Sequence, residues 1–492
     1  MAHTQIPDLN LPNRGIVVFS GGSAANSLVD VFTEIAQKRQ ASLGYIIPIS
    51  DNGGSSSELI RVFGGPGIGD IRSRLVRLIP SNQSAIYALL NHRLSRSREQ
   101  AYSDWQDIVA GTSPLWTPIS PDTRELLRSM LNHVNFEIIK RARPPVSTFN
   151  FSSASVGNLF LTGARLFTGS FESAIHLLAL ICGILPEKME VVPAINSNFS
   201  HHISAGLYDG TVITGQNAIS HPSEPAAFPS DNQISLASMQ DSSSSSSHSV
   251  QSSSKHGRCN PSTLIEMDDA SAEDANLPGS LHVLRKAEIN FSKSPDTEES
   301  LTSRIERIWY INPYGQEMSP AANPKAVSVI KSAEALVYSI GSLYTSIVPC
   351  LILRGIGEAI VSSVGVKQKI LIVNGSNDRE TGPKADPMDA VDFVAAIARA
   401  GEESRGYRNG IPSVNIWKKY ITHLIYLEGD GAPKVDRTAL NAAGVDCIRC
   451  WGRKADDGSW RYNANSLLGA LEAILGRGDK SRDRSRRNTM EK

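Results

Sequence analysis

The chain has 492 residues, enough for two or three average domains or for one large α/β domain with insertions. Basic and acidic residues number 49 each, so the formal net charge is zero and gives no electrostatic case for binding nucleic acid or a membrane. No unbroken stretch of about 18 apolar residues is present, residues 1–7 do not resemble a secretory signal, and the five cysteines are scattered. We therefore expect a cytoplasmic protein with reduced thiols.

The first predicted strand covers residues 15–20, and Gly21-Gly22-Ser23 follow it at once. A helix is predicted over residues 24–37, with apolar residues at helical spacing. A strand, a glycine turn and a helix form the phosphate-binding start of a doubly wound fold. Both the lysine-bearing P-loop pattern and G-x-G-x-x-G are absent, so the match is to the physics of an anion site rather than to either named motif.

The second predicted strand, residues 45–49, runs into a loop of glycine and serine that begins Ser50-Asp51-Asn52 and continues Gly53-Gly54-Ser55-Ser56-Ser57. Adjacent glycines let the backbone approach a ligand, and the loop amides can converge on an anion. Asp51 stands at the carboxyl end of a strand, where open α/β sheets bind ligands. A carboxylate beside a phosphate nest is best explained by a bridging divalent cation, and an ordinary surface loop is the alternative.

A second glycine-rich loop, residues 64–69, leads into a helix whose first turn contains Asp70. Arg72 and Arg74 follow and could clamp a phosphate or a carboxylate. The alternatives are that Asp70 only caps the helix and that the arginines form a solvated face.

Residues 82–142 have a mostly helical pattern, and we expect their basic residues to face solvent: Arg93, Arg96 and Arg98. Two apolar helices are predicted over residues 158–168 and 171–183, joined near Gly169. Asn158 enters the first of them and needs a polar partner, which is either a ligand or a neighbouring loop.

After a strand at residues 189–195, the alternating pattern of residues 201–219 is split by Asp209-Gly210, a strong hairpin signal. Residues 221–300 then change composition and include an unbroken run of serines, which cannot bury enough apolar surface to fold. We predict a disordered insertion there, within one domain whose two parts are residues 15–220 and 301–477. A flexible N-terminus (1–14) and a basic disordered tail (478–492) are expected to flank it.

The second part repeats the alternation of strands and helices. Strands are predicted over residues 305–311, 335–340, 369–373, 421–427 and 445–450, and helices over 323–333, 387–400 and 464–476. Gly341-Ser342 follow one strand and could present amides to an anion, and Asn374 opens a polar loop whose alternative interpretation is an exposed turn. The whole pattern predicts an α/β fold, Rossmann-like and doubly wound, with a mainly parallel sheet covered by helices on both faces.

Six of these segments, in this order, resemble motifs of the CofD/YvcK-like family. They are Gly21 to Ser23, Ser50 to Ser56, Gly67 to Arg72, Ser155 to Phe160, Ser339 to Pro349 and Asn374 to Thr381. The resemblance spans about residues 15–220 and 300–475. It implies a Rossmann-like core with a ligand cleft at the strand ends.

The family includes the 2-phospho-L-lactate transferase of deazaflavin coenzyme synthesis and the YvcK nucleotide-sugar-binding regulators. The resemblance therefore implies a nucleotide-linked ligand, a guanosine or uridine diphosphate conjugate, bound with Mg²⁺. Asp51 would hold the metal, and the loops at Gly21-Gly22-Ser23 and Gly53-Gly54-Ser55-Ser56 would cradle phosphate oxygens. Residues implied in the cleft with less defined roles are Asp70, Asn158, Gly341, Ser342 and Asn374, and Arg72 remains a candidate for binding phosphate. Asp51 and Asp70 are the candidate catalytic residues. A homodimer is compatible with the sequence, which does not fix the oligomeric state.

Two positions depart from the family pattern. Asn52 stands where many relatives have a second acidic residue, so a neutral amide replaces one metal ligand. Gln216 stands where the YvcK-like branch often has glutamate. The alternative to a transferase is therefore a non-catalytic YvcK-like regulator that binds a nucleotide sugar.

Overall fold

The computed structural model describes residues 15–22, 24–144, 147–221, 281, 284, 300–407, 410, 412–456 and 458–476. The predictions of a flexible N-terminus, a disordered insertion and a disordered tail fall largely outside these residues, as does the proposed role of Ser23.

The centre of the molecule is a seven-stranded sheet in the order β11-β10-β9-β8-β1-β2-β3. All of its neighbouring strands pair in parallel. Its strands are β1 (Gly15–Phe19), β2 (Ser42–Ile47), β3 (Met189–Pro193), β8 (Ala333–Tyr338), β9 (Gln368–Ile372), β10 (His423–Tyr426) and β11 (Asp446–Arg449). β1 is buried along its whole length, as expected of a strand covered on both faces.

The chain winds outward from the middle of this sheet in two directions. From β1 it proceeds to β2 and β3, and the second part returns to β8 beside β1 and proceeds to β9, β10 and β11. Right-handed crossovers in opposite directions place their helices on opposite faces. The predicted doubly wound, Rossmann-like α/β fold is confirmed, and β1 and β8 flank its switch point.

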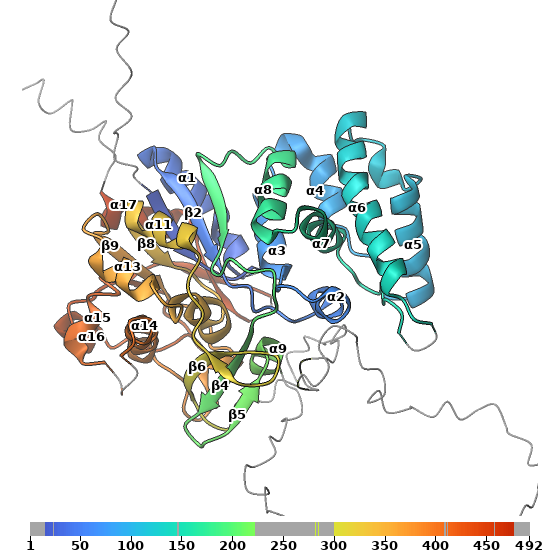
Figure 1. Ribbon diagram of the computed structural model, residues 1–492. Helices are drawn as coiled ribbons and strands as arrows, with labels where there is room; N and C mark the ends of the chain where they lie inside the picture. Colours follow the sequence, from blue (N-terminus) through green and yellow to red (C-terminus); the bar gives the residue numbers. More distant parts are fainter. Residues whose placement is uncertain are drawn as a thin grey trace, which may run out of the picture.

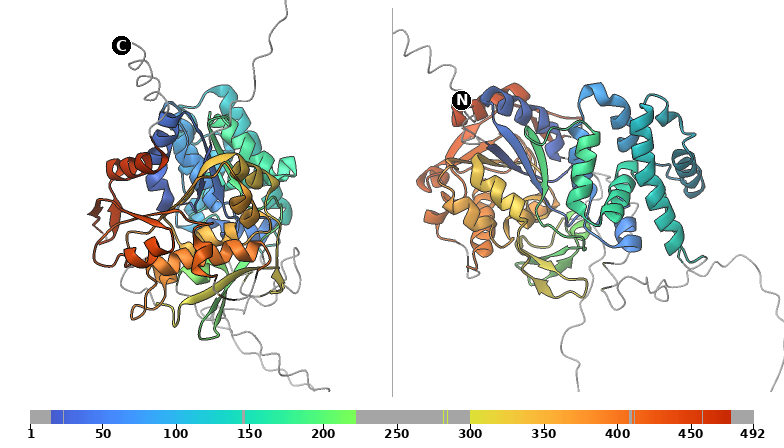
Figure 2. Two further views of the ribbon diagram at one scale, coloured as in Figure 1. Left: turned by 90° about the vertical axis from the view of Figure 1, so that its left-hand side faces the viewer. Right: turned by 45° about the horizontal axis from the view of Figure 1, so that its top comes forward.

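Helices cover both faces of the sheet (Figures 1 and 2). One face carries α1 (Val29–Arg39), preceded by the 3₁₀ turn η1 (Ala24–Leu28), together with α17 (Ala464–Leu475), which packs against α1. The other face carries α11 (Pro324–Ser332), α12 (Val348–Leu351), α13 (Ile356–Ser362) and α14 (Ala390–Ser404). Of the shorter helices, α15 (Val414–Trp417) packs against α14 and α16 (Arg437–Ala442) packs against β11.

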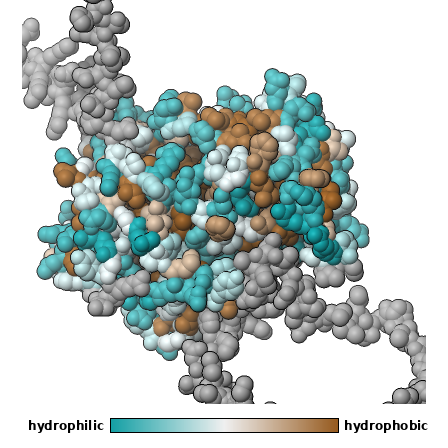
Figure 3. Space-filling model, in the orientation of Figure 1, coloured by the Kyte–Doolittle hydropathy of each residue, from teal (hydrophilic) through white to brown (hydrophobic). Residues whose placement is uncertain are grey.

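The chain between β2 and β3 forms a layer of helices, seen at the right of Figure 1. It follows α2 (Ser55–Phe63) and α3 (Gly69–Arg77), and consists of α4 (Ser84–Asn91), α5 (Arg98–Ala110), α6 (Pro121–Arg141), α7 (Val156–Thr168) and α8 (Phe171–Ile181), with short turns η2 (Ser81–Gln83) and η3 (Pro114–Trp116). Gly169 joins α7 to α8, as predicted, and the structure shows it in the left-handed conformation. Apolar side chains gather over this layer in Figure 3, and those of Phe167 and Leu180 are exposed.

A small antiparallel sheet in the order β5-β4-β6-β7 lies below the main sheet in Figure 1. The predicted hairpin forms its β4 (His202–Leu207) and β5 (Val212–Thr214), and β6 (Ile305–Ile311) and β7 (Glu317–Met318) complete it. The second run of the hairpin ends earlier than expected, because residues from Gln216 onward form α9 (Gln216–Ser220). β6 has an ordinary strand pattern, which does not reveal that it pairs with β4 rather than joining the parallel sheet.

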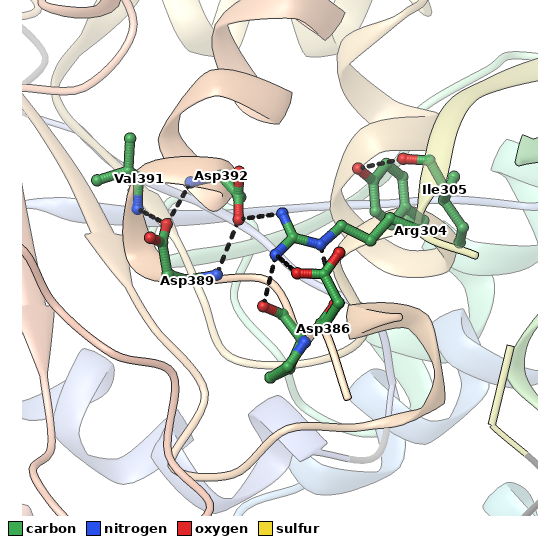
Figure 4. A network of polar contacts seen from close by, with 8 residues as sticks. Arg304, Ile305, Asp386, Asp389, Val391 and Asp392 are labelled. Atoms are coloured by element: carbon green, nitrogen blue, oxygen red, sulfur yellow. Dashed lines mark hydrogen bonds and ion pairs between the residues drawn. The ribbon is translucent and has the colours of Figure 1, made fainter. Parts of the chain in front are cut away.

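Arg304 fastens this sheet to the main body (Figure 4). Its guanidinium donates to Oδ1 of Asp386 at 2.6 Å and to Oδ2 of Asp392 at 2.8 Å. Asp392 belongs to the capping box of α14, in which the Asp389 side chain accepts from the backbone of Val391 and Asp392. The start of β6 is therefore held to the first turn of a helix of the other sheet.

A second hairpin, β12 (Gly452–Lys454) and β13 (Trp460–Tyr462), closes over the end of β9. A Cβ added at Gly375, just past β9, would collide with the carbonyl oxygen of Trp460. This hairpin is absent from the predicted elements, because its short polar strands carry no clear alternation.

Candidate functional site

Four loops with candidate residues lie side by side at the carboxyl edge of the sheet. They follow β1, β2, β8 and β9, which are neighbours in the order β9-β8-β1-β2. Backbone pairing continues beyond the strands. The amide of Ser20 donates to Ile46 O at 3.2 Å, and the amide of Ser339 donates to Phe19 O at 3.0 Å. Four loops thus meet at the switch point, where doubly wound folds bind ligands. They are the loops at Gly21, Asp51, Gly341 and Asn374, and the first and last of them are about 350 residues apart in sequence.

Asp51 and Asp70 lie in a cradle of glycine backbone. A Cβ at Gly69 would collide with the Asp51 carboxylate, and a Cβ at Gly22 would collide with that of Asp70. Because Gly69 precedes Asp70 directly, the two carboxylates share one small space between the ends of β1 and β2. Side chains larger than hydrogen would fill that space, which explains the two glycines physically.

Burial raises the pKa of both carboxyl groups, and the charge of Asp51 adds to the rise at Asp70. The pKa of Asp70 is raised to about 7, first by burial and then by the negative charge of Asp51, and a hydrogen bond from the Gly22 backbone opposes the rise. Burial also raises the pKa of Asp51, opposed by the Gly53 amide, which donates to Oδ1 at 3.1 Å. Both residues keep part of their surface exposed, so they lie deep in a site that solvent reaches.

Asp70 does not cap its own helix. α3 begins at Gly69, its N-cap residue is Ile68, and no side chain caps it. The alternative interpretation of Asp70 as an N-cap is therefore wrong, since the residue lies inside the first turn.

The two arginines of α3 differ in their surroundings. Arg74 is completely buried and donates to Ser20 Oγ and to Gly21 O, both at 3.2 Å, while its guanidinium lies 4.4 Å from the centre of the Tyr45 ring. It therefore supports the loop after β1 from behind. Arg72 donates through Nε to Oδ1 of Asn158 at 3.2 Å, and it has no carboxylate within ion-pair distance among the described residues. Neither arginine belongs to a solvated face.

Asn158 joins two predicted site residues. Its Oδ1 accepts from Arg72, and its Nδ2 donates to Ser55 Oγ at 2.9 Å. Asn158 is buried in the first turn of α7, so of the two open interpretations the structure supports the bridging of neighbouring protein groups. It orients Arg72 and the start of α2.

The serines of the Asp51 loop begin α2, whose N-cap is Gly54 with a φ of 55°. Ser55 and Ser56 are buried, and the Ser56 hydroxyl lies close to Gly69 in the aspartate cradle. No side chain caps this helix. The start of α2 therefore lies beside the Asp51 carboxylate, and its role as a ligand loop stays a prediction.

Gly341 and Asn374 form a clasp between the ends of β8 and β9. The Gly341 amide donates to Asn374 Oδ1, and Asn374 Nδ2 donates to Gly341 O, both at 2.9 Å. Asn374 thus acts on the loop backbone. Ser342, partly exposed, is the N-cap residue of the π-helical turn η6 (Leu343–Ile347).

A buried carboxylate at Glu380 was missed by sequence reasoning. It accepts from the amides of Tyr344 and Thr345 at 2.9 and 3.1 Å and from the hydroxyls of Thr345 and Ser220 at 2.6 and 2.7 Å. Two amides of the predicted anion-presenting turn are therefore occupied by an anion of the protein itself. The loop after β9, which contains η7 (Arg379–Thr381), is a buried brace and not an exposed turn; only the presence of an acidic residue in it could have signalled this.

The side chain of Asn52 lies against the segment that leads into α9. Its Oδ1 accepts from the backbone amide of Asn217 at 3.1 Å, near the start of α9, where Gln216 is also found. The two departures from the family pattern are thus neighbours in space.

Two negative findings concern the described part of the chain. No group of three or more His, Cys, Asp or Glu side chains is arranged there to hold a metal ion, and none of its helices has both the length and the apolar character needed to cross a membrane. Cys447 and Cys450 form no metal cluster within it.

Comparisons with known proteins agree with this architecture. The family model of the 2-phospho-L-lactate transferase CofD matches residues 16–449. The uncharacterized protein YNL011C of Saccharomyces cerevisiae is 40% identical over 442 residues, which are 88% of this chain and 94% of that protein. A gluconeogenesis factor of Halalkalibacterium halodurans is 22% identical over 209 residues, 42% of this chain and 46% of that protein.

The fold itself matches a solved structure. The crystal structure of protein BH3568 from Bacillus halodurans superimposes with a TM-score of 0.55 at 19% identity, covering 94% of this chain and 100% of that chain. Since the family model spans most of the sequence and the fold agrees, the chain belongs to the CofD family.

Proposed function

We propose that this chain binds a nucleoside diphosphate conjugate together with Mg²⁺ at the carboxyl edge of β1, β2 and β8, and that it acts as a transferase of the 2-phospho-L-lactate type. The observation that carries the proposal is the carboxylate pair of Asp51 and Asp70 in a glycine cradle at the switch point of the sheet. Membership of the CofD family supports the reaction class.

The aspartate pair suits a magnesium ion. Mg²⁺ usually binds proteins through one or two carboxylates and completes its shell with phosphate oxygens and water, so a third acidic side chain is not needed. The mutual repulsion that raises the pKa of Asp70 would be relieved by a cation between the two groups. Asp51 and Asp70 would hold the ion, which would neutralise charge on the phosphates.

The remaining residues of the site would position the ligand. The backbone at Gly21 and Gly22 and the start of α2 at Gly53, Gly54, Ser55 and Ser56 would contact phosphate oxygens. Phosphoryl transfer needs mainly positioning and charge neutralisation, which backbone amides, Arg72 and a metal can provide.

The second candidate is a regulator that binds a nucleotide sugar without turning it over. Asn52 favours it, because a neutral amide that is committed to α9 offers no second acidic ligand in this loop. The relative named a gluconeogenesis factor also favours it. A turnover assay separates the two candidates, since release of GMP or UMP supports the transferase and binding without release supports the regulator.

The site is tested by Asp51→Ala. We expect the affinity for GDP or a uridine diphosphate sugar in Mg²⁺ to fall at least tenfold, about 1.4 kcal/mol. Isothermal titration with and without EDTA measures this loss. Asp122→Ala, at an exposed carboxylate of α6, is the matched control and should bind like the parent. An affinity of the Asp51 variant within about twofold of the parent would contradict the placement of the metal.

A further inference from the structure

A second arginine lies beside Arg72 and comes from the helical layer. Arg93 follows α4, is exposed, and was expected to face bulk solvent. Its one hydrogen bond among the described residues runs from Nη1 to Ser153 O at 3.3 Å. In that same part of the chain neither Arg93 nor Arg72 has a carboxylate within ion-pair distance, and the terminal nitrogens of Arg72 have no hydrogen-bond partner.

The backbone holds Arg93 close to Arg72. Arg93 pairs with Ser155 in an antiparallel bridge, and Ser155 is the N-cap residue of α7. The side chain of Arg72 lies over the same first turn, since a Cβ at Gly157 would approach its Cδ to 2.9 Å. Two guanidinium groups therefore converge on the start of one helix, where backbone amides also favour negative charge.

Burial and like charge both disfavour this arrangement. The side chain of Arg72 is buried, and the positive charge of Arg93 acts on it, whereas the carboxylates of Asp51 and Asp70 act on it in the opposite sense without forming an ion pair among the described residues. An anion bound between the two guanidinium groups would offset their repulsion.

Other arginines nearby are already occupied. Arg74 is bonded to the loop after β1, and Arg165 donates to Gly64 O at 3.1 Å and approaches Asn198 O at 3.5 Å. Arg98 donates to Thr148 Oγ1 at 2.5 Å. Within the described residues, the combination of a buried guanidinium with free terminal donors and a second guanidinium beside it is found at Arg72 and Arg93.

We propose that Arg72 and Arg93 form an anion subsite that receives a second negatively charged group of the bound compound, a phosphate or a carboxylate. The proposal rests on the proposed function for the position of the diphosphate at the glycine loops. It also bears on the choice between the two candidate functions. A three-carbon acid joined to the diphosphate carries a carboxylate for this subsite, whereas a neutral sugar carries none.

The test compares two commercial phosphate esters of one carbon skeleton. 2-Phosphoglycerate carries a phosphate and a carboxylate, and glycerol 2-phosphate carries the phosphate alone. Isothermal titration of the full chain in Mg²⁺ measures both affinities for the parent, for Arg93→Gln and for Arg96→Gln. Arg96 is an exposed arginine of the same segment and serves as the matched control.

We expect Arg93→Gln to lose about tenfold in affinity, as for a hydrogen bond to a charged group, and Arg96→Gln to lose none. A loss confined to 2-phosphoglycerate assigns the subsite to carboxylate, and an equal loss for both compounds assigns it to phosphate. Unchanged affinities in Arg93→Gln overturn the proposal. The proposal is also overturned if the parent binds none of 2-phosphoglycerate, glycerol 2-phosphate and inorganic pyrophosphate. GDP affinity is measured separately, so a protein that binds the esters but no nucleotide overturns the proposed function alone.

Discussion

At the scale of single residues, Asp51 and Asp70 are two neighbouring carboxyl groups whose charged forms are disfavoured in the folded protein. Burial favours the protonated form of both carboxyl groups, and the charge of Asp51 further favours the protonated form of Asp70. Such pairs occur where a protein binds a cation or moves a proton, so the strain is consistent with a functional site. It also makes a measurable contribution to stability.

The pair predicts that stability falls as pH rises. The ordinary pKa of an aspartate is 3.8, and that of Asp70 is raised to about 7 in the folded chain. At a pH between these two values the folded state therefore holds a proton that the unfolded state has lost. Stability is therefore greatest at the acidic end of this window and declines through it to about pH 7. Asp70→Asn removes the titration, so the variant should gain stability relative to the parent between pH 5 and pH 8. Urea unfolding in EDTA measures this difference.

A matched variant, Asp122→Asn, checks that the effect comes from the site. Asp122 is exposed in the first turn of α6, so its substitution should shift stability equally at both pH values. A constant difference between Asp70→Asn and the parent across the window would show that the pair is not strained in the metal-free protein.

Residue types at the site were predictable from the sequence, but their partners were not. Asn158 and Asn374 were both expected in the cleft, and the structure shows that the side-chain amide of each is hydrogen-bonded to groups of the protein. Arg72 and Arg74 are only two residues apart on α3, and the sequence does not distinguish them. Arg74 supports the loop after β1, whereas the terminal nitrogens of Arg72 remain free among the described residues. Partner choice depends on segments far apart in sequence, which no local pattern encodes.

At the scale of elements, α9 connects the Asp51 loop to the turn after β8. Asn52 accepts from the amide of Asn217, and Ser220 at the other end donates to Glu380, which holds the amides of Tyr344 and Thr345. The loops after β2 and β8, which border the candidate site, are thus joined through one short helix and one buried carboxylate. Burial raises the pKa of Glu380, and its four hydrogen bonds oppose that rise.

Glu380→Gln should destabilise the protein. The glutamine amide has the size of the carboxylate, but its NH₂ must face at least one of the four donors, and its oxygen is a weaker acceptor than a carboxylate. We expect the free energy of unfolding to fall by about 1.5–3 kcal/mol. Urea titration at pH 7.5 measures it. Glu187→Gln, at an exposed glutamate, should change nothing measurable, and a Glu380 variant within about 0.5 kcal/mol of the parent would contradict the brace.

Most elements of the parallel sheet followed from the sequence, because their strands are short apolar runs between glycine turns and amphipathic helices. The antiparallel sheet followed only in part. Its hairpin of β4 and β5 was predicted, but β6 (Ile305–Ile311) has the same pattern as a central strand, and its partner β4 lies on the other side of the insertion. The hairpin of β12 and β13 was also missed, because its strands have three residues each. Pairing over long sequence distances is decided by packing rather than by local pattern.

At the scale of the whole molecule, both ends of the insertion are fastened to the core. The chain leaves after α9, where Ser220 donates to Glu380, and returns before β6, where Thr302 Oγ1 donates to Asp209 Oδ2 at 2.6 Å. Arg304 then binds Asp386 and Asp392. Within the inserted segment, Leu281 donates its amide to Pro313 O at 2.9 Å, and its side chain lies against Gly315.

These contacts predict that residues 224–277 can be replaced by a short Gly/Ser linker without loss of the fold. The core closes through β4 and β6 and through Arg304, none of which belongs to the deleted part. Shortening a loop of this length favours folding by about 1–2 kcal/mol, because closing it costs less chain entropy. Urea unfolding should therefore show unchanged or slightly raised stability. Extending the deletion to residue 299 removes the contacts of Leu281 and should cancel the gain in the free energy of unfolding. A fall of more than about 2 kcal/mol in that free energy on the shorter deletion would show that the serine-rich segment packs on the core.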